Sequence, residues 1–402
     1  MIVRKGAVNA GGGRRPGYVA AAVVFAIGMA GTTLPTPLYG LYQEQIGFSE
    51  LMVTVVFAVY AVAVITVLLV AGNYSDEVGR RTVLLIAMAS SAASAGCFLL
   101  ESGLPLLFAG RLFSGFAAGL LSGAATAAVI ELAGPGQKAR AGFAATAANM
   151  GGLGCGPLLS GLLAQYAPWP LMLPFWVHLG LVAVASGITW FLPETVAEPK
   201  RWPPLQPQGV RVPPEVKGVF APAAVAAFAG FALLGLFTAV APSFASQTLG
   251  VHNLAVTGAV VFSVFLASTV GQSLTQRIGA RLALPVGCAI LVVGLMLVAS
   301  SLIAESLALL VLGALFGGAG QGLAFRAALT LISGAAPAQH RGGTISAFFV
   351  VAYAGISLPV VGVGAMATWL GLREAGLIFT GCVMLLAASA GTYAALRPPT
   401  GP

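Results

Sequence analysis

Charged side chains are scarce in this chain. Of its 402 residues, 7% are charged and 58% are hydrophobic, whereas soluble globular domains place a charge at about a quarter of their positions. A soluble body of this size is therefore excluded. The apolar runs reach about 20 residues, which is enough for a helix to cross the ~30 Å hydrocarbon layer of a membrane. The composition predicts an all-α polytopic membrane protein.

The absence of several sequence motifs excludes further classes of function. Each of the four cysteines stands alone in an apolar run, which gives no metal-ligand spacing and favours small packing residues. We find no Ser/His/Asp or Cys/His constellation of an enzyme and no GxxxxGK[ST] loop for direct use of ATP. The basic residues form no stripe for nucleic acid. We therefore expect a non-enzyme without cofactor or metal, whose surroundings are a lipid bilayer.

The apolar runs between polar breaks predict twelve membrane spans in two six-helix bundles. The spans are expected near residues 17–40, 51–72, 82–100, 104–131, 140–165, 172–192, 218–245, 254–276, 282–301, 305–334, 343–368 and 374–396. The first run is too long for the core of a cleaved signal, so we expect it to be retained. The expected organisation is a tail (1–16), a bundle (17–192), a proline-rich linker (193–217), a second bundle (218–396) and a tail (397–402).

The basic residues predict the orientation. With the N-terminus inside, all Lys and Arg residues except Arg111, Arg326 and Arg373 fall on inner segments. Such a bias sets membrane topology. We expect a multi-pass protein of the inner (plasma) membrane with both termini, and the linker, in the cytoplasm.

The two halves of the chain are related in sequence. Three matches recur at offsets of 200 to 203 residues: Gly79 and Arg81 with Gly279 and Arg281, segment 110–120 with segment 313–323, and Pro157 with Pro359. Internal repeats of this kind build transporters whose substrate site lies between the halves, near the middle of the membrane.

A polar turn between the second and third expected spans contains the only aspartate of the chain. Its pattern resembles the signature loop of the major facilitator superfamily, at the place where that family has it, in Gly72, Asp76, Gly79, Arg80 and Arg81. Asp76 can cap the third span or pair with an arginine. The resemblance implies a conformational latch on the cytoplasmic side, whereas a simpler interpretation gives the arginines only a topological role.

Two further motifs add to this resemblance, which covers almost the whole chain. Arg111, followed by Gly115 and Gly119, is similar to the fourth-span arginine motif of the family. A fifth-span motif resembles the glycine–proline pattern of its antiporters, in Gly152, Gly156, Pro157 and Gly161. Small residues at such spacings also allow close helix packing. The most similar group is the twelve-span bacterial drug:proton antiporters, which implies alternating access, a small-molecule substrate and proton exchange by a monomer.

Two charges, Arg111 and Arg326, lie well inside expected spans, where an arginine costs about 2.5–3.5 kcal/mol. Each faces a cavity or partner, or else extends its side chain to the membrane surface. No Asp or Glu lies deep in a span, unlike in many multidrug members of the group. A cationic substrate is therefore disfavoured, and the hypothesis is that Arg326, together with Arg111, attracts an anionic group of the substrate.

The remaining candidate residues are polar groups within or at the ends of spans. For the cavity we expect Asn149, Gln272, Gln321 and Tyr353; for proton coupling we expect Glu44, Asp76, Glu131 and His178, the last being alternatively a packing residue. The sequence favours an exporter of small amphipathic compounds that exchanges them for protons. The alternatives are a facilitator or symporter for a small, anionic metabolite and a non-transporting sensor of the same fold.

Overall fold

The computed structural model describes residues 17–72, 74–100, 103–196 and 209–397. These residues form helices and no strand. The expected tail 1–16, the last residues 398–402 and the part 197–208 of the expected linker lie outside the described residues.

The N-terminal half contains six long helices and three short ones. In chain order they are α1 (Gly17–Thr33), η1 (Thr36–Leu38), α2 (Tyr39–Ile46), α3 (Glu50–Ala71), α4 (Tyr74–Val78), α5 (Arg80–Leu99), α6 (Leu104–Glu131), α7 (Lys138–Tyr166) and α8 (Leu173–Phe191). The first expected span is interrupted after Thr33, because Pro35 and Pro37 lack the N–H that an α-helix needs. It continues through η1 and α2 to Ile46, beyond the expected end.

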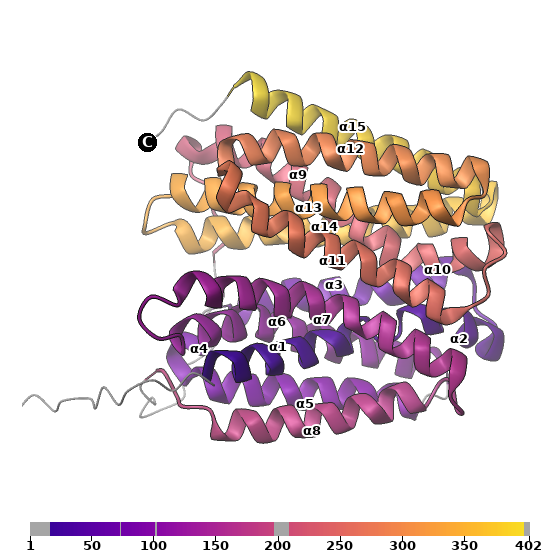
Figure 1. Cartoon of the computed structure of the whole chain (residues 1–402), viewed down its shortest axis with the longest axis horizontal. Helices are drawn as coiled ribbons and strands as arrows, with labels where there is room; N and C mark the ends of the chain where they lie inside the picture. The colour runs from indigo at the N-terminus through magenta and orange to yellow at the C-terminus, as the bar shows by residue number, and fades with distance from the viewer. Residues whose placement is uncertain (1–16, 73, 101–102, 197–208, 398–402) are drawn as a thin grey trace, which may run out of the picture.

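The C-terminal half repeats this plan. Its helices are η2 (Pro214–Val216), α9 (Lys217–Gly235), η3 (Leu236–Val240), α10 (Ala241–Ser243), η4 (Phe244–Thr248), α11 (Leu254–Ile278), α12 (Ala280–Ala304), α13 (Leu307–Ala335), α14 (Arg341–Leu370) and α15 (Leu372–Leu396). Figure 1 shows the two halves one above the other, with their long helices aligned along the longest axis of the molecule.

Each half has six long helices of the lengths that a membrane requires. Eleven helical segments of the described residues are long and apolar enough to cross a membrane. The twelfth, α7, has 29 residues but is rich in glycine and begins with a basic turn. It packs between α1 of its own half and α11 of the other half. The fold is therefore an all-α polytopic membrane protein with twelve spans.

Glycines hold the same pairs of helices together in both halves. A Cβ at Gly115 of α6 would lie 2.5 Å from the carbonyl oxygen of Tyr60 in α3. A Cβ at Gly318 of α13 would lie 3.0 Å from the carbonyl carbon of Val264 in α11. Such close approach of small residues is how helices associate in lipid. The sequence repeat is thus also a repeat of packing.

The two ends of the bundle differ in charge. We call the end at which Gly17 and Arg397 lie the terminal face, and the opposite end, with α2 and α10, the distal face (Figure 1). The described basic residues at helix ends or connections of the terminal face are Arg80, Arg81, Lys138, Arg140, Arg211, Lys217, Arg277, Arg281, Arg341 and Arg397. Among the described residues, Arg373 is the one basic residue at the distal face.

Candidate functional site

A cavity of about 550 Å³ lies between the two halves. Thr32 and Thr238 line its inner end, and its lining reaches Ile130 and Ser333 near the terminal ends of α6 and α13. Most of the lining is apolar or aromatic, including Phe57, Tyr60, Phe231, Phe265, Phe325, Phe349 and Tyr353. A chamber of this size and character suits a small amphipathic molecule.

Arg111 points into this cavity and does not extend to the membrane surface. Its side chain is 2% exposed although it lies only seven residues from the distal end of α6. One guanidinium nitrogen, Nη1, donates a hydrogen bond of 2.6 Å to the carbonyl oxygen of Thr32. The guanidinium lies over the rings of Tyr60 and Phe57, at 4.6 and 5.2 Å from their centres. The interpretation of Arg111 as a snorkelling residue is therefore wrong.

The structure brings some of the expected cavity residues together and separates others. Asn149, Gln272, Arg326 and Tyr353 line the cavity with Arg111. Gln321 does not line it: the side chain is buried within the C-terminal half and accepts a hydrogen bond of 2.7 Å from Ser268. Gln321 lies five positions before Arg326 on α13 and is therefore on a different face of this helix, which explains why Arg326 lines the cavity and Gln321 does not.

The expected proton carriers lie outside the cavity. His178 of α8 is buried within the N-terminal half, 2.9 Å from the hydroxyl of Ser91, as expected of a packing residue. Glu44 lies at the distal face, and Glu131 belongs to the terminal face. Within the described lining of the cavity there is thus no carboxylate or histidine.

Two close helix crossings seal the cavity from the distal face. A Cβ at Gly161 of α7 would overlap the carbonyl oxygen of Leu254 in α11. A Cβ at Gly364 of α14 would lie 3.1 Å from the Cα of Leu51 in α3. Each crossing joins one half to the other. Because the backbones touch here and the cavity lining reaches the terminal ends of the helices, the structure is closed distally and accessible from the terminal face.

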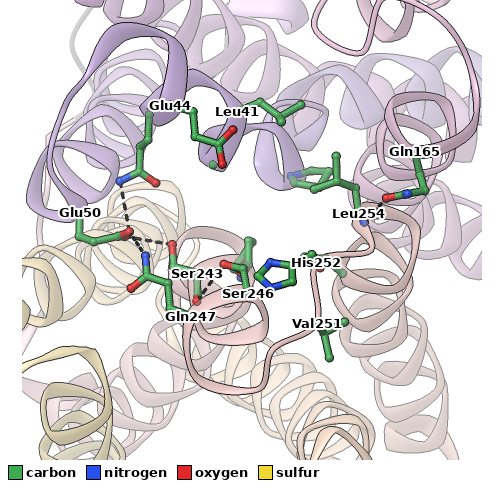
Figure 2. A pocket seen from close by; sticks show the side chains of 15 residues that line it. Leu41, Glu44, Glu50, Gln165, Ser243, Ser246, Gln247, Val251, His252 and Leu254 are labelled. Carbon is green, nitrogen blue, oxygen red and sulfur yellow. Dashed lines mark hydrogen bonds between the residues drawn. The ribbon is translucent and has the colours of Figure 1, made fainter.

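A second pocket, of about 660 Å³, lies outside this seal at the distal face. Figure 2 shows the Glu50 carboxylate among polar side chains of this pocket. It accepts hydrogen bonds from Gln247 (2.6 Å) and Ser243 (2.9 Å) of the C-terminal half, and from Gln43 (3.2 Å) of its own half. We call these four residues the distal clasp. It links the two halves in addition to the glycine crossings.

The signature turn forms a network at the terminal face. Arg80 pairs with Asp76 and, at 2.9 Å, with Glu131 at the end of α6, and it donates to the hydroxyl of Ser75 at 2.6 Å. Arg81 lies over the ring of Trp190 in α8 at 5.0 Å. All these partners belong to the N-terminal half. The interactions described for Asp76 therefore stay within one half in this conformation.

Glu194, and not Asp76, caps the third span. Its two carboxylate oxygens accept hydrogen bonds of 2.9 Å from the backbone N–H groups of Arg80 and Arg81. Asp76 lies in the separate short helix α4, so the expected capping role was wrong. Gly79 adopts φ +101°, and a Cβ there would lie 2.6 Å from a Glu194 oxygen. Glycine is required for both reasons.

The remaining motif residues have packing positions. Gly72 ends α3 in a right-handed conformation. Gly119 lies against Val67 of α3, Gly152 lies against the backbone of α1, and so does Gly156. Pro157 lies inside α7 next to Gly258 of α11. At the echo in the C-terminal half, Gly279 keeps a positive φ of 84°, but no ion pair among the described residues includes the exposed Arg281.

Replacing Glu194 by alanine is expected to destabilise the terminal face by about 1–2 kcal/mol, as the loss of a helix cap does. The matched control is Glu77→Ala, which removes an exposed carboxylate from the same turn. Thermal unfolding of the purified protein in detergent should show a lower midpoint for Glu194→Ala alone. Equal midpoints for the two variants would contradict the capping role.

Sequence reasoning missed Glu50, Glu194 and Gly364. Glu50 follows Ser49, which caps α3, and at such a position a glutamate is ordinarily part of the first helical turn. Glu194 was assigned to the linker. Gly364 could have been found, because it lies 203 residues after Gly161, at the offset of the repeat.

Comparison with known proteins decides the family. A family model described as the Major Facilitator Superfamily matches residues 19–358. The chain belongs to the major facilitator superfamily. Its relatives in this superfamily are transporters, so this chain is a membrane transport protein by family and not an enzyme. Within the described residues no group of three His, Cys, Asp or Glu side chains could hold a metal ion.

One curated relative is a tetracycline resistance protein, class D, of Salmonella ordonez. It is 31% identical over 139 residues, which are 34% of each of the two chains. This major facilitator chain thus matches about a third of the length of that relative.

Solved major facilitator structures share the fold over nearly the whole chain. A bacterial homologue of the human lysosomal transporter Spinster, inward-facing and occupied, has a TM-score of 0.70 with 14% identity over 96% of this chain and 98% of its own. The human organic anion transporter MFSD10 has a TM-score of 0.66 with 18% identity over 95% and 100% of the two chains. A POT family transporter in complex with 5-aminolevulinic acid has a TM-score of 0.77 with 12% identity over 95% and 96%.

Proposed function

We propose that this protein exports small amphipathic compounds, drug-like molecules or secondary metabolites, across the inner (plasma) membrane by alternating access. The observation that supports it best is the cavity between the halves, which is sealed at one face and reaches the other. Transporters of this kind expose one central site to each side of the membrane in turn. One chain encloses the cavity, so a monomer is sufficient for this mechanism.

The proposed orientation places the terminal face in the cytoplasm. The support is the distribution of the described basic residues, which gather at the terminal face while Arg373 lies at the distal face. In this orientation the structure is open to the cytoplasm and ready to take up a compound for export. The tetracycline resistance relative supports a drug-like compound as the substrate.

We propose that the network around Arg80 is part of the latch that holds the cytoplasmic side closed when the cavity is open to the opposite side. Asp76, Gly79, Arg80 and Arg81 lie at the terminal ends of α4 and α5, where the two halves must meet when the cytoplasmic side closes. Glu131 and Glu194 hold this turn in one conformation. Gly279 and Arg281 occupy the related place in the other half.

A second candidate function is a facilitator or symporter for a small anionic metabolite. The observation that favours it is the absence of carboxylates from the described lining of the cavity. If the protein is instead an antiporter, proton exchange has to use carboxylates outside the cavity, such as Glu44 and Glu50 at the distal face and Asp76 and Glu131 at the terminal face.

Transport by purified protein in liposomes tests these alternatives. With an acidic lumen, an antiporter should drive a fluorescent amphiphile into the lumen while protons leave, and a protonophore should abolish this uptake. Uptake that does not depend on the pH gradient would favour the facilitator. A folded protein that moves no compound of a broad panel would contradict transport altogether and favour a sensor.

Loss of the distal clasp is expected to favour the outward-open form. Glu50→Ala removes three hydrogen bonds to a carboxylate, two of them between the halves. Hydrogen bonds to a charged group contribute about 1.5–3 kcal/mol, so the equilibrium should move by roughly 10-fold or more.

The readout is labelling of a cysteine introduced at Thr238, which lines the inner end of the cavity, by an impermeant maleimide added at the distal face. The four native cysteines are replaced by alanine in this background. Glu44→Ala is the control, because Glu44 is an exposed carboxylate that lines the same pocket (Figure 2) but is not one of the four clasp residues. Glu44 and His252, the other titratable groups that line this pocket, are unchanged in the Glu50→Ala variant. Unchanged labelling would contradict a closing role of the clasp.

A further inference from the structure

The charges of the central cavity have one sign. Arg111 and Arg326 are the charged residues of its described lining, and no ion pair among the described residues includes either of them. A charge in a low-dielectric site normally has a partner, because an unpaired one costs several kcal/mol. The partner of these two arginines is therefore to be sought outside the protein.

Arg111 has unused hydrogen-bonding capacity at the sealed end of the cavity. Its guanidinium offers five N–H donors, and the hydrogen bond found for it joins Nη1 to Thr32. Its buried Nε has no hydrogen-bond partner among the described residues. The rings of Tyr60 and Phe57 cover one side of the group but accept no conventional hydrogen bond. An oxyanion with two acceptor oxygens matches a guanidinium edge of this kind.

Arg326 lies nearer the entrance. It is nine residues from the terminal end of α13, or about 13 Å along the helix, whereas Arg111 lies near the distal end of α6. The two charges are thus placed one after the other along the cavity. Phe325 and Phe349, also in the lining, stand edge to face with their ring centres 6.1 Å apart and provide an apolar surface next to Arg326.

We propose that the central cavity binds an amphipathic organic monoanion, whose carboxylate or similar oxyanion pairs with Arg111 while its apolar part lies among the aromatic rings. Arg326 attracts the anion at the entrance and raises its local concentration. The inference rests on the proposed transport function, since it names the substrate class of the same cavity.

Three dansyl probes of nearly equal size test the charge preference directly. Dansylglycine is an anion at neutral pH, dansylglycinamide is neutral, and dansylethylenediamine is a cation. Binding to the purified protein is followed by fluorescence anisotropy, with protein-free micelles subtracted. We expect the anion to bind about tenfold tighter than the amide, as a charge-assisted pair does, and the cation to bind weakest. Equal binding of anion and amide, preference for the cation, or no binding of any probe would overturn the proposal.

Variants separate the roles of the two arginines. Arg111→Gln should reduce the anion-to-amide ratio to about three, which is the share of Arg326, and Arg111→Lys should not restore it, because a paired oxyanion needs the planar fork of arginine. Arg326→Gln should weaken binding of the anion about threefold and reduce its salt dependence, whereas Arg326→Lys should retain both. Full anion preference and salt dependence in Arg326→Gln would refute the attraction by Arg326, even if the Arg111 variants do not fold.

The same probes distinguish this inference from the proposed function. If the anion binds preferentially but liposomes containing the protein do not transport it, the anion site stands and transport fails. If anion and amide bind equally and are both transported, transport stands and the anion site fails.

Discussion

A single methyl group at Gly364 or Gly161 is expected to lower transport about tenfold or more while the protein remains folded. At Gly364 the added Cβ would lie 3.0 Å from Thr54 Cγ2 and 3.1 Å from Leu51 Cα; at Gly161 it would overlap the carbonyl oxygen of Leu254. All these atoms belong to the opposite half. Overlap of this kind costs about 1–3 kcal/mol, and here the cost falls on the distally closed state alone.

The measurement combines transport with distal labelling of the cysteine that Thr238→Cys introduces in the background without native cysteines. Gly364→Ala and Gly161→Ala should increase the labelling and decrease the transport rate. The controls are Gly362→Ala on α14 and Gly151→Ala on α7, where an added Cβ meets nothing within 4 Å. If all four variants behave alike, the crossings do not form the distal seal.

Valine at Gly322 or Gly115 is expected to prevent folding. A Cβ at Gly322 would lie 2.8 Å from the carbonyl carbon of Ser268, and one at Gly115 would lie 2.5 Å from the carbonyl oxygen of Tyr60. These backbone contacts lie within a half, so no rigid-body movement of the two halves relieves them. We expect a loss of at least about 3 kcal/mol.

Size-exclusion profiles in detergent measure this effect as loss of the monodisperse protein. Gly334→Val is the control on α13, because an added Cβ there meets nothing within 4 Å. A folded Gly322→Val protein with normal transport would show that the two helices can separate, contrary to the close packing described above. The two sets of glycines thus have different roles. Gly161 and Gly364 are needed for the conformational cycle, whereas Gly115 and Gly322 are needed for folding.

Composition and the apolar runs between polar breaks were sufficient to predict the fold, because membrane spans are long and few other folds can cross a bilayer. The depth of Arg111 was also predictable from its distance to the end of a span. The direction in which the Arg111 side chain points was not predictable, since hydropathy along one helix does not reveal which face of the helix meets the cavity. Gln321 was misplaced for the same reason: it lies on the same helix as Arg326, yet only Arg326 lines the cavity.

The polar contacts between distant segments were beyond sequence reasoning. Glu194 caps a helix that begins 114 positions earlier in the chain, and Glu50 reaches Gln247, 197 positions later. Neither pairing leaves a local pattern, because the partners meet only through the packing of the spans. Capping was one of the two roles considered for Asp76, beside pairing with an arginine, because Asp76 is close in sequence to the third span.

The two distal crossings correspond residue by residue. Gly161 meets Leu254, and Gly364 meets Leu51; both pairs are related by a shift of 203 positions, since 364 − 161 and 254 − 51 are equal. In a symmetric homodimer, residue i of one subunit meets residue j of the other, and j meets i. The contact between the halves has this isologous form within one chain. The interface therefore has the two-fold symmetric form of a homodimer contact, with the two halves of one chain in the place of the two subunits.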